Sequence, residues 1–273
     1  MGWVRKLAAA VVGAVAVAAS AGGTPAQAIV GGNEASAGQY PYMAGLLLTN
    51  DRSLMCGGTL ISDQWVLTAA HCVTWGSSPM PAPELTVLLG TVDRVTPEPT
   101  GKFYTVRTIT IHRSFDSKVL ANDIALVELT QKVQQSSYIQ PVQLAPGTLS
   151  TQNLAGRELT ATGWGTHEFG GPQSRRLHRV RLDAITNSAC QAGAPRDKIT
   201  SNQICTQDQG KGICQFDAGG PLTYPDPYTS TPRLAAVISH TGACGEAPPV
   251  INTFVPPYLT WIQDTIRQAT ATS

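Results

Sequence analysis

The sequence of 273 residues predicts an all-β protein, and three observations lead to this fold class. Short apolar runs of four to eight residues recur along the chain, separated by Gly, Pro, Asn and Asp. Glycine and proline are abundant, with 26 and 19 residues, whereas charged residues make up 14% of the chain, against about 25% in an average domain. The clearest helical periodicity is confined to the last segment. Many short strands between turn residues favour a barrel or a sandwich.

The predicted strands are the apolar runs that contain β-branched and aromatic residues. Such side chains pack well on a pleated sheet, and turn residues bound each run. In chain order the predicted strands are Met43–Leu48, Trp65–Thr68, Leu85–Leu89, Val106–Ile111, Ile124–Leu129, Glu158–Thr162, Leu234–Ile238 and Val250–Val255.

One helix is predicted at the end of the chain, at residues 257–269. Pro257 suits the first turn of a helix, where a backbone N–H would have no partner in any case. The apolar side chains that follow recur at the spacing of one helix face, and polar residues occupy the positions between them. This apolar stripe consists of Tyr258, Trp261, Ile262 and Ile266.

Residues 1–28 have the pattern of a secretory signal peptide. Arg5 and Lys6 form a short basic start, residues 7–19 are apolar or small, and residues 26–28 read Ala-Gln-Ala, an A-x-A cleavage signal. The apolar run of about 13 residues is too short for a bilayer core that needs roughly 20. We therefore expect cleavage after Ala28 and a soluble, secreted, extracellular product.

The chain that follows the predicted cleavage site is nearly neutral. Without residues 1–28, which hold two basic residues and no acid, 17 Lys and Arg stand against 18 Asp and Glu, a formal charge of −1. A nearly neutral chain lacks the electrostatic footprint of a protein that binds nucleic acid or an anionic membrane. We therefore expect neither partner, and we expect a monomer.

The length and a break in composition indicate two β halves. About 245 residues remain after cleavage, enough for one large β domain or for two small ones that share a core. The break lies at Ala145-Pro146-Gly147, which the polar run at residues 150–153 follows. The first half is therefore predicted at residues 29–147 and the second at 148–255. No internal sequence repeat is strong enough to prove the halves alike.

Six cysteines in an exported chain indicate three disulfides. Six cysteines allow 15 pairings, and the residues alone do not choose among them. A zinc site is the competing interpretation, but the chain has no C-x2-C pair and no histidine at ligand spacing from a cysteine pair. We therefore expect no metal and no other cofactor.

Three short segments carry the residue types of an acyl-transfer site. Residues 67–72 read Leu-Thr-Ala-Ala-His-Cys, residues 122–126 read Asn-Asp-Ile-Ala-Leu, and residues 214–221 read Cys-Gln-Phe-Asp-Ala-Gly-Gly-Pro. They resemble the histidine, aspartate and nucleophile segments of trypsin- and chymotrypsin-like serine proteases, in the same chain order. Ile-Val-Gly-Gly at 29–32 and Thr-Gly-Trp-Gly at 162–165 add to the resemblance, which covers nearly all of residues 29–269.

This resemblance implies the fold in more detail. Relatives of this kind have a chymotrypsin-like fold of two six-stranded antiparallel Greek-key β-barrels with a C-terminal α-helix. The resemblance therefore implies one protease-like domain over residues 29–270. The first barrel is expected at about 29–147, the second at about 148–255 and the helix at about 257–269.

The resemblance also assigns the catalytic positions, one of which is altered. In such proteases a histidine takes the proton of a serine nucleophile, and a buried carboxylate fixes the tautomer of the histidine. His71 would be the base, Asp123 the orienting group and Ser239 a hydrogen-bond partner of Asp123. Ala218 stands at the position of the nucleophile, and its methyl group cannot attack a carbonyl. Loss of the nucleophile costs a comparable serine protease about 10⁶-fold in turnover, or about 8 kcal/mol.

Residues around the nucleophile position have expected supporting roles. The backbone N–H groups of Phe216 and Ala218 would form the oxyanion hole; Phe216 replaces the usual glycine but keeps its N–H group. A free Ile29 amine would pair with Asp217, because a buried ammonium needs an anionic partner. Since the predicted cleavage after Ala28 itself frees that amine, we expect no separate zymogen stage.

The disulfides and the specificity pocket follow from the same resemblance. The implied disulfides are Cys56–Cys72, Cys190–Cys205 and Cys214–Cys244, each stabilising by roughly 3 kcal/mol through chain entropy. The residues expected to form the pocket are Gly212, Ile213, His240, Thr241 and Val250. Gly212 takes the place of the aspartate that binds basic residues, and branched side chains fill the slot. Any residue bound there should be small and uncharged.

Two functions from different classes fit this sequence. In the first, the chain is a pseudoprotease that binds extended peptides, protein ligands or protease inhibitors without cleaving them. In the second, it is a serine endopeptidase that hydrolyses peptide bonds after small neutral residues, with Ala218 an engineered inactivating substitution. The codon at position 218 in the source gene discriminates between them. No acidic loop is clear enough to predict a calcium site.

Overall fold

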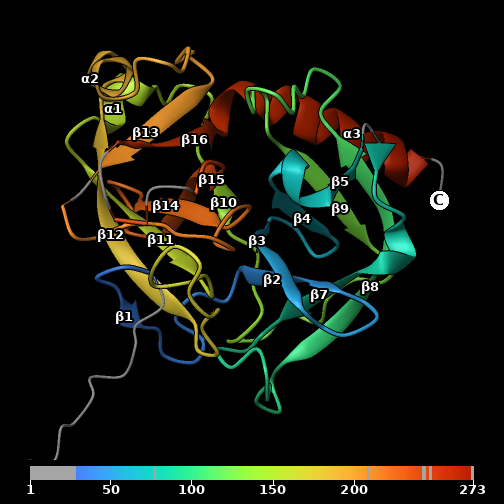
Figure 1. Cartoon of the computed structure of the whole chain (residues 1–273). Coiled ribbons are helices and arrows are strands. Elements are labelled where there is room, and N and C mark those ends of the chain that lie inside the picture. Colours follow the sequence, from blue (N-terminus) through green and yellow to red (C-terminus); the bar gives the residue numbers. More distant parts are fainter. Residues whose placement is uncertain (1–28, 77, 208, 242–243, 246–247, 272–273) are drawn as a thin grey trace, which may run out of the picture.

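The computed structural model describes residues 29–271 apart from positions 77, 208, 242–243 and 246–247. The predicted signal peptide, residues 1–28, lies outside the described residues. Strands dominate, and they form two closed six-stranded antiparallel barrels followed by a C-terminal helix (Figure 1). The fold expected from the resemblance is therefore confirmed. Within the described part of the chain, no helix has both the length and the hydropathy to cross a membrane.

The first barrel closes in the order β2-β3-β4-β9-β8-β7, with every neighbouring pair antiparallel. Four of its six strands, β2, β4, β7 and β9, are buried along nearly their whole length. The hairpin of β5 (Thr74–Trp75) and β6 (Ser78–Pro79) lies outside the barrel. The barrel strands are β2 (Met43–Leu48), β3 (Leu54–Leu60), β4 (Trp65–Thr68), β7 (Leu85–Leu89), β8 (Lys102–Ile111) and β9 (Ala125–Leu129).

The second barrel closes through the pairing of β12 with β13. Two short strands extend it: β1 (Asn33–Glu34) pairs with β12, and β10 (Gln143–Leu144) pairs in parallel with β15. The barrel strands, which pair in the order β12-β11-β14-β15-β16-β13, are β11 (Glu158–Gly163), β12 (His178–Ile185), β13 (Gln203–Gln207), β14 (Pro221–Pro225), β15 (Pro232–Ile238) and β16 (Val250–Phe254).

The two barrels have the same strand order. If the six strands of each barrel are numbered along the chain, both close as 1-2-3-6-5-4. The halves are therefore alike in topology although their sequences show no clear repeat. The connection between the barrels runs from the end of β9 to the start of β11, residues 130–157, and the boundary predicted after residue 147 falls within it.

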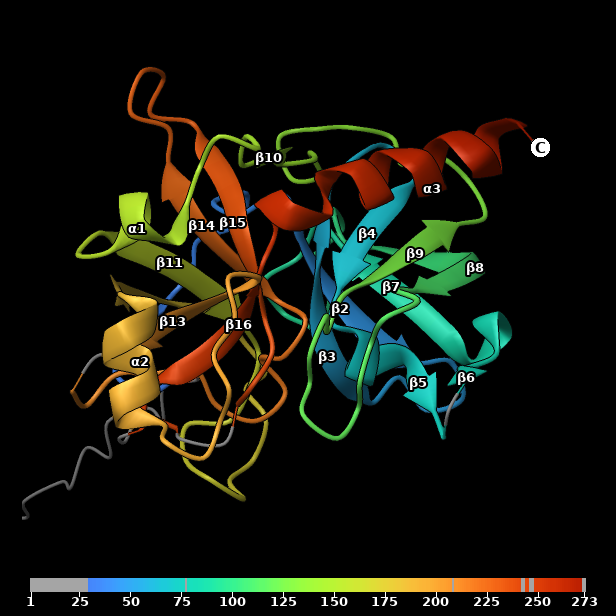
Figure 2. The ribbon, with the colours of Figure 1, turned by 90° about the horizontal axis from the view of Figure 1, so that it is seen from above.

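The start of the described chain packs in the second barrel, and its end packs on the first barrel. Ile29 is fully buried in the core of the second barrel. The C-terminal helix α3 (Leu259–Ala271) lies along the first barrel (Figure 2), and its residue Ile262 belongs to the first-barrel core. The predicted apolar stripe is confirmed, but a 3₁₀ turn at Pro256–Tyr258 precedes the helix, which begins two residues later than expected.

Two short helices, α1 (Thr151–Leu154) and α2 (Asn187–Gly193), were not expected.

A mixed apolar and ionic interface joins the barrels. Trp164 is 1% exposed, packs in a cluster with residues of both barrels, and donates a hydrogen bond of 2.9 Å from Nε1 to the Val92 carbonyl. At the rim of this cluster two ion pairs cross between the halves, Arg175 to Asp93 at 2.7 Å and Arg176 to Glu98 at 3.2 Å. We call the four charged residues Asp93, Glu98, Arg175 and Arg176 the ionic clamp.

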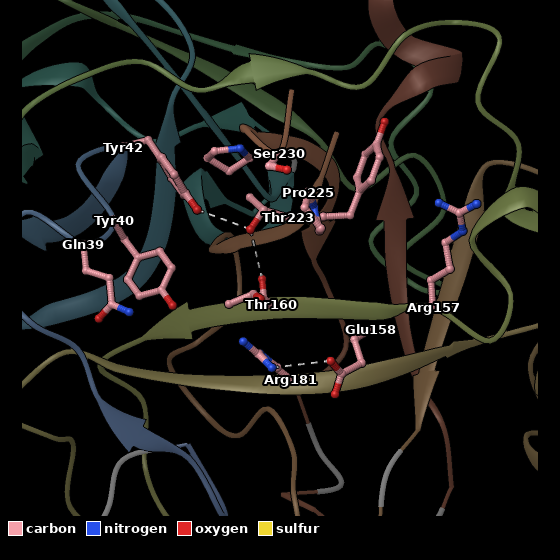
Figure 3. A pocket seen from close by; sticks show the side chains of 12 residues that line it. Gln39, Tyr40, Tyr42, Arg157, Glu158, Thr160, Arg181, Thr223, Pro225 and Ser230 are labelled. Carbon is pink, nitrogen blue, oxygen red and sulfur yellow. Dashed lines mark hydrogen bonds and ion pairs between the residues drawn. The ribbon is translucent and has the colours of Figure 1, made fainter. Parts of the chain in front are cut away.

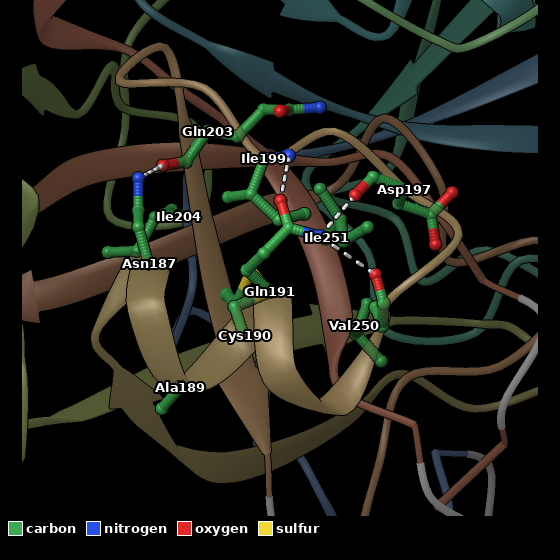
Figure 4. Close-up of a disulfide and its surroundings, with 12 residues drawn as sticks. Asn187, Ala189, Cys190, Gln191, Asp197, Ile199, Gln203, Ile204, Val250 and Ile251 are labelled. Carbon is green, nitrogen blue, oxygen red and sulfur yellow. Dashed lines mark hydrogen bonds between the residues drawn. A yellow bond between two sulfur atoms is a disulfide. The ribbon is translucent and has the colours of Figure 1, made fainter.

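All three expected disulfides are confirmed. Cys56–Cys72 joins β3 to the 3₁₀ turn at Ala70–Val73, and Cys214–Cys244 joins the loop before β14 to the loop before β16. Cys190–Cys205 fastens α2 to β13 (Figure 4). There the side chain of Gln191 accepts a hydrogen bond of 3.1 Å from the Ile199 backbone, which orders the loop that follows α2.

Candidate active site

The site begins with a histidine and an aspartate from neighbouring loops of the first barrel. His71 lies in the 3₁₀ turn that follows β4, and Asp123 lies two residues before β9, the strand that pairs with β4. Asp123 Oδ2 lies 2.7 Å from His71 Nδ1, and Asp123 Oδ1 accepts a bond of 2.9 Å from the His71 backbone N–H. The carboxylate therefore fixes both the position of the turn and the direction of the imidazole, and leaves Nε2 on the opposite side.

Asp123 is completely buried yet well supplied with donors. Burial alone would raise the pKa of its carboxyl group, but the His71 side chain, Ser239 and the His71 backbone outweigh this effect and lower it. Ser239, which follows β15 in the second barrel, donates a bond of 2.6 Å to Asp123 Oδ2 and is 3% exposed. The structure thus brings His71, Asp123 and Ser239 together.

Two supports of Asp123 were missed by the sequence reasoning. Thr253 of β16 donates a hydrogen bond of 2.9 Å to the Asp123 carbonyl. Asn122 adopts a φ of 53°, a left-handed conformation that asparagine tolerates, and its side-chain oxygen accepts a bond of 2.9 Å from the Tyr258 hydroxyl. The only signal in the sequence was the asparagine next to the aspartate. Both contacts link the aspartate loop to the second half of the chain.

Ala218 lies on a loop of the second barrel that packs against the first. Gly57 of β3 donates a backbone bond of 2.7 Å to the Ala218 carbonyl. The residue is 4% exposed, and its side chain belongs to the same core cluster as Ala70 and Cys72, the neighbours of His71. A methyl group therefore lies next to the histidine turn, at the position where the sequence predicts the nucleophile. Ser239 offers no substitute, because its hydroxyl is buried and bonded to Asp123.

The loop before Ala218 leaves two backbone donors free. Among the described residues, the N–H groups of Phe216 and Ala218 have no hydrogen-bond partner, whereas that of Asp217 donates to the Cys214 carbonyl at 3.2 Å. Phe216 adopts a φ of 70°, which costs a non-glycine residue roughly 1–2 kcal/mol. Backbone strain of this kind is typical of functional loops. Such a pair of donors can bind an oxyanion or a carbonyl oxygen.

Asp217 is a second fully buried carboxyl group. Its oxygens accept backbone bonds from Gly165 at 2.8 Å and from Cys214 at 3.0 Å. Burial raises its pKa to about 7 in spite of these two donors. A Cβ atom on Gly163 would lie 2.1 Å from Asp217 Oδ1, and one on Gly165 would lie 2.5 Å from it. The glycines of the Thr-Gly-Trp-Gly segment therefore make room for this carboxyl group.

Ile29 packs in the core of the second barrel, the half that also holds Asp217. Its side chain is fully buried, and its φ of 57° turns the chain into the second barrel. The next residue, Val30, accepts a backbone bond of 3.0 Å from Gly212. In the described part of the chain no cationic group pairs with Asp217. An anionic Asp217 therefore lacks a counter-ion in this state.

The residues expected to form the specificity pocket lie in the second barrel and at its edge. Ile213 and Val250 are buried in the second-barrel core, and Gly212 and Val250 line a cavity of about 10 Å³, room for one water molecule. His240 and Thr241 are half-buried. Burial lowers the pKa of His240, whose Nδ1 lies 3.1 Å from the Ile251 carbonyl oxygen.

One group of side chains has the spacing of a metal site. Potential ligand atoms of Cys56, His71 and Cys72 lie within 4.8 Å of one another. The two sulfur atoms form a disulfide with each other, so they cannot act as thiolate ligands. The donor set therefore does not fit a metal ion.

Comparison with known proteins gives the same family throughout. A sequence model described as Trypsin matches residues 29–262. The chain is 34% identical over 241 residues to the serine protease SP24D of Anopheles gambiae, covering 88% of this chain and 82% of the relative. It is 32% identical over 238 residues to a venom serine protease of Polistes dominula, covering 86% and 84% of the two chains. Trypsin V-B of Rattus norvegicus is 32% identical over 241 residues, covering 87% and 89%.

Proposed function

The chain belongs to the trypsin family of serine proteases, and from that premise we propose that it binds extended peptide or protein segments without hydrolysing them. The observation that carries the proposal is the hydrogen-bonded group of His71, Asp123 and Ser239 beside a methyl group at Ala218. The base and its orienting acid have nothing to deprotonate. The chain is thus a pseudoprotease whose cleft keeps its binding function.

The geometry of the nucleophile loop supports the binding part of the proposal. Within the described part of the chain, Phe216 and Ala218 each present an unpartnered backbone N–H group. A carbonyl oxygen of a bound peptide accepts from these donors in the position where an oxyanion would form. The loop does not need a side-chain hydroxyl at position 218 for this contact, because both donors belong to the backbone. Binding therefore survives the loss of the hydroxyl group, whereas turnover does not.

The ligand class follows from the cleft and from the relatives. Peptide and protein substrates are what serine proteases of this family act on, and protease inhibitors bind to the same surface. Gly212 offers no charge for a basic residue, and the branched side chain of Val250 takes up space, which together favour a small neutral side chain at the residue that would precede the cleaved bond. The signal-peptide pattern of residues 1–28 supports secretion to the extracellular space, and a relative described as a venom serine protease is consistent with it.

The direct test compares the chain with its Ala218→Ser variant. Both are assayed on casein and on peptide p-nitroanilides that carry Ala, Val, Lys or Phe before the scissile bond. We expect no turnover above background for the chain itself, and a gain of at least 10³-fold for Ala218→Ser on the Ala and Val substrates. The double variant Ala218→Ser, His71→Ala is the matched control and should lose that gain.

Binding is measured separately from turnover. Isothermal titration with a protein inhibitor of serine proteases whose reactive loop carries Ala before its scissile bond should give a saturable one-to-one complex. Ala218→Pro removes one of the two free N–H donors at a residue whose φ is not left-handed, and should weaken this complex at least tenfold. Turnover of casein by the unaltered chain, abolished by His71→Ala, would disprove the proposal.

A further inference from the structure

A large groove lies outside the candidate active site, where two strands of the second barrel separate. β11 pairs with β12 over six residue pairs, but with β14 over only two, Thr160 with Thr223 and Ala161 with Leu222. On its other side, the pairing of β14 with β15 shifts register between Leu222 and Thr223, where Ala235 of β15 is the extra residue. Pro225, which would face Glu158 next along the ladder, has no N–H group to continue it. The start of β11, residues 158–159, is therefore left unpaired on the β14 side.

The space that opens between the strands has a volume of about 820 Å³. This is within the range of roughly 300–1,000 Å³ typical of ligand sites. Its floor is the buried pair of Tyr42 and Thr223, whose hydroxyl oxygens lie 3.2 Å apart, and its walls come from Tyr40, from Tyr224 and from the hairpin that joins β14 to β15. Figure 3 shows Tyr40 and Tyr42 on one side of the groove and Arg157 on the other.

Two guanidinium groups give the groove a positive character. Arg157 forms no ion pair with another described residue. Arg181 is 60% exposed and pairs with Glu158 only at 3.6 Å (Figure 3). Glu158 is the one carboxylate among the described residues that line the groove. The hydroxyl groups of Tyr40 and Tyr224 have no hydrogen-bond partner in the described part of the chain. Two cations, two free hydroxyl groups and one carboxylate favour an anionic ligand.

The charges of nearby arginines affect the pKa of the two tyrosine hydroxyl groups that line the groove. Burial raises the pKa of Tyr40, while the charges of Arg179 and Arg181 act in the opposite direction. Burial likewise raises the pKa of Tyr224, and Arg157 is among the charges that counter it. The two tyrosines and the two arginines all line the same groove. An acidic group placed there meets both kinds of donor, and charge-assisted bonds of this type are the strongest that a protein surface offers.

We infer that this groove binds an extended peptide segment that carries acidic side chains. The unpaired start of β11 supplies backbone hydrogen-bonding groups that an extended chain can pair with, as in other cases of strand addition. Arg157 and Arg181 bind its carboxylates, and the tyrosine rings pack against its apolar side chains. None of the lining residues belongs to the candidate active site, so the groove and the cleft are tested independently.

The test is isothermal titration with two matched hexapeptides, acetyl-Glu-Val-Glu-Val-Glu-Val-amide and its counterpart with Gln in place of Glu. The Glu peptide should bind at least tenfold more tightly than the Gln peptide. The double variant Arg157→Gln, Arg181→Gln should lose at least tenfold in affinity for the Glu peptide. Glu158→Gln should bind it severalfold more tightly, because the competing carboxylate is gone.

The control is Arg267→Gln, which removes an exposed arginine on α3, far along the chain from the groove. This variant should bind the Glu peptide as the unaltered chain does. The charge reversal Arg157→Glu, Arg181→Glu should instead bind a third hexapeptide, with Lys in place of Glu. Such binding also shows that the variant is folded. Equal affinity for the Glu and Gln peptides, or unchanged binding in the Arg→Gln double variant, overturns the inference. So does binding of glutarate as tight as that of the hexapeptide, because the ligand would then be a small anion.

Discussion

Ser239 of the second barrel donates a hydrogen bond of 2.6 Å to the Asp123 carboxylate of the first barrel. The same oxygen of Asp123 lies 2.7 Å from His71 Nδ1. The orienting group of the candidate site is therefore held from both barrels at once. Its geometry depends on how the two halves dock, and not only on the loop in which it lies.

Ser239→Ala should destabilise the protein. The substitution removes one hydrogen bond to a fully buried carboxylate, and bonds to charged groups contribute about 1.5–3 kcal/mol. We expect the free energy of unfolding in urea at pH 7 to fall by that amount. Ser117→Ala, at an exposed serine, is the control and should change it by less than about 0.5 kcal/mol. Equal effects of the two substitutions would show that the Asp123 contact contributes nothing.

The pH dependence of stability should reveal whether the Ile29 amine reaches Asp217. Burial raises the folded-state pKa of Asp217 from 3.8 to about 7, so its stabilising effect is complete below pH 3.8 and disappears as the pH rises through about 7. A chain that retains Gln27 and Ala28 should therefore lose up to about 4 kcal/mol of stability from this group between pH 4 and pH 7. A chain that begins at Ile29 should lose much less, because its ammonium group stabilises the carboxylate.

The measurement is the difference in free energy of unfolding between these two chains at several pH values. It should grow from pH 4 to pH 7, and Asp217→Asn should abolish the growth in both. Parallel curves for the two chains would mean that Ile29 and Asp217 do not pair.

The ionic clamp should stabilise the docked barrels above acidic pH. Burial alone would raise the pKa of Asp93, but the Thr96 N–H and the Arg175 guanidinium outweigh it and lower the pKa. The hydrogen bonds that Glu98 accepts lower its pKa against burial in the same way. A lowered pKa means that this stability is present above the ordinary carboxyl range and is lost as the pH falls through the folded value.

Substituting the two arginines tests the clamp. Arg175→Gln and Arg176→Gln should each cost up to about 1 kcal/mol at pH 7 and less in 1 M NaCl, because both side chains are partly exposed. The cost should shrink at pH 2, where the carboxyl groups approach neutrality. Arg267→Gln, which removes an exposed pair within α3, should show little effect under any of these conditions. A cost that is the same at both pH values would assign it to packing instead.

The Phe216→Gly variant should be more stable than the Phe216→Ala variant. Its φ of 70° is left-handed, a conformation that glycine adopts freely and alanine does not. Both variants lose the aromatic ring, so their difference isolates the backbone. We expect Phe216→Gly to exceed Phe216→Ala by about 1 kcal/mol in free energy of unfolding. If Phe216→Ala equals or exceeds it, the loop relaxes to another conformation when the ring is removed.

Much of the fold could be predicted from the sequence, and the failures have identifiable causes. Strands with continuous apolar runs, such as β2 and β7, were found with their bounds. β3 was missed because the glycines at 57 and 58 interrupt its apolar run. β14 was missed because prolines begin and end it. β12 alternates buried and exposed residues over eight positions, a period-two signal that was present and was overlooked.

The candidate site was predictable only in part. Short motifs identified His71, Asp123 and the Ala218 loop, because their chemistry requires particular residue types. Thr253 and Tyr258 could not be found in this way, since each acts on the Asp123 loop from more than 100 residues along the chain. The groove between β11 and β14 was equally hidden, because the two strands pair over only two residue pairs and the length of a pairing leaves no motif.

The most direct test of the central claim is labelling with a fluorophosphonate, which reacts with an activated serine, followed by intact-mass analysis. The account predicts no adduct on the unaltered chain, and a single near-stoichiometric adduct on Ala218→Ser that His71→Ala removes. An adduct on the unaltered chain that disappears in His71→Ala would show another nucleophile at the site and contradict the account. So would an Ala218→Ser variant that folds but does not react, because the base, its orienting acid and the donors would then not form a working site.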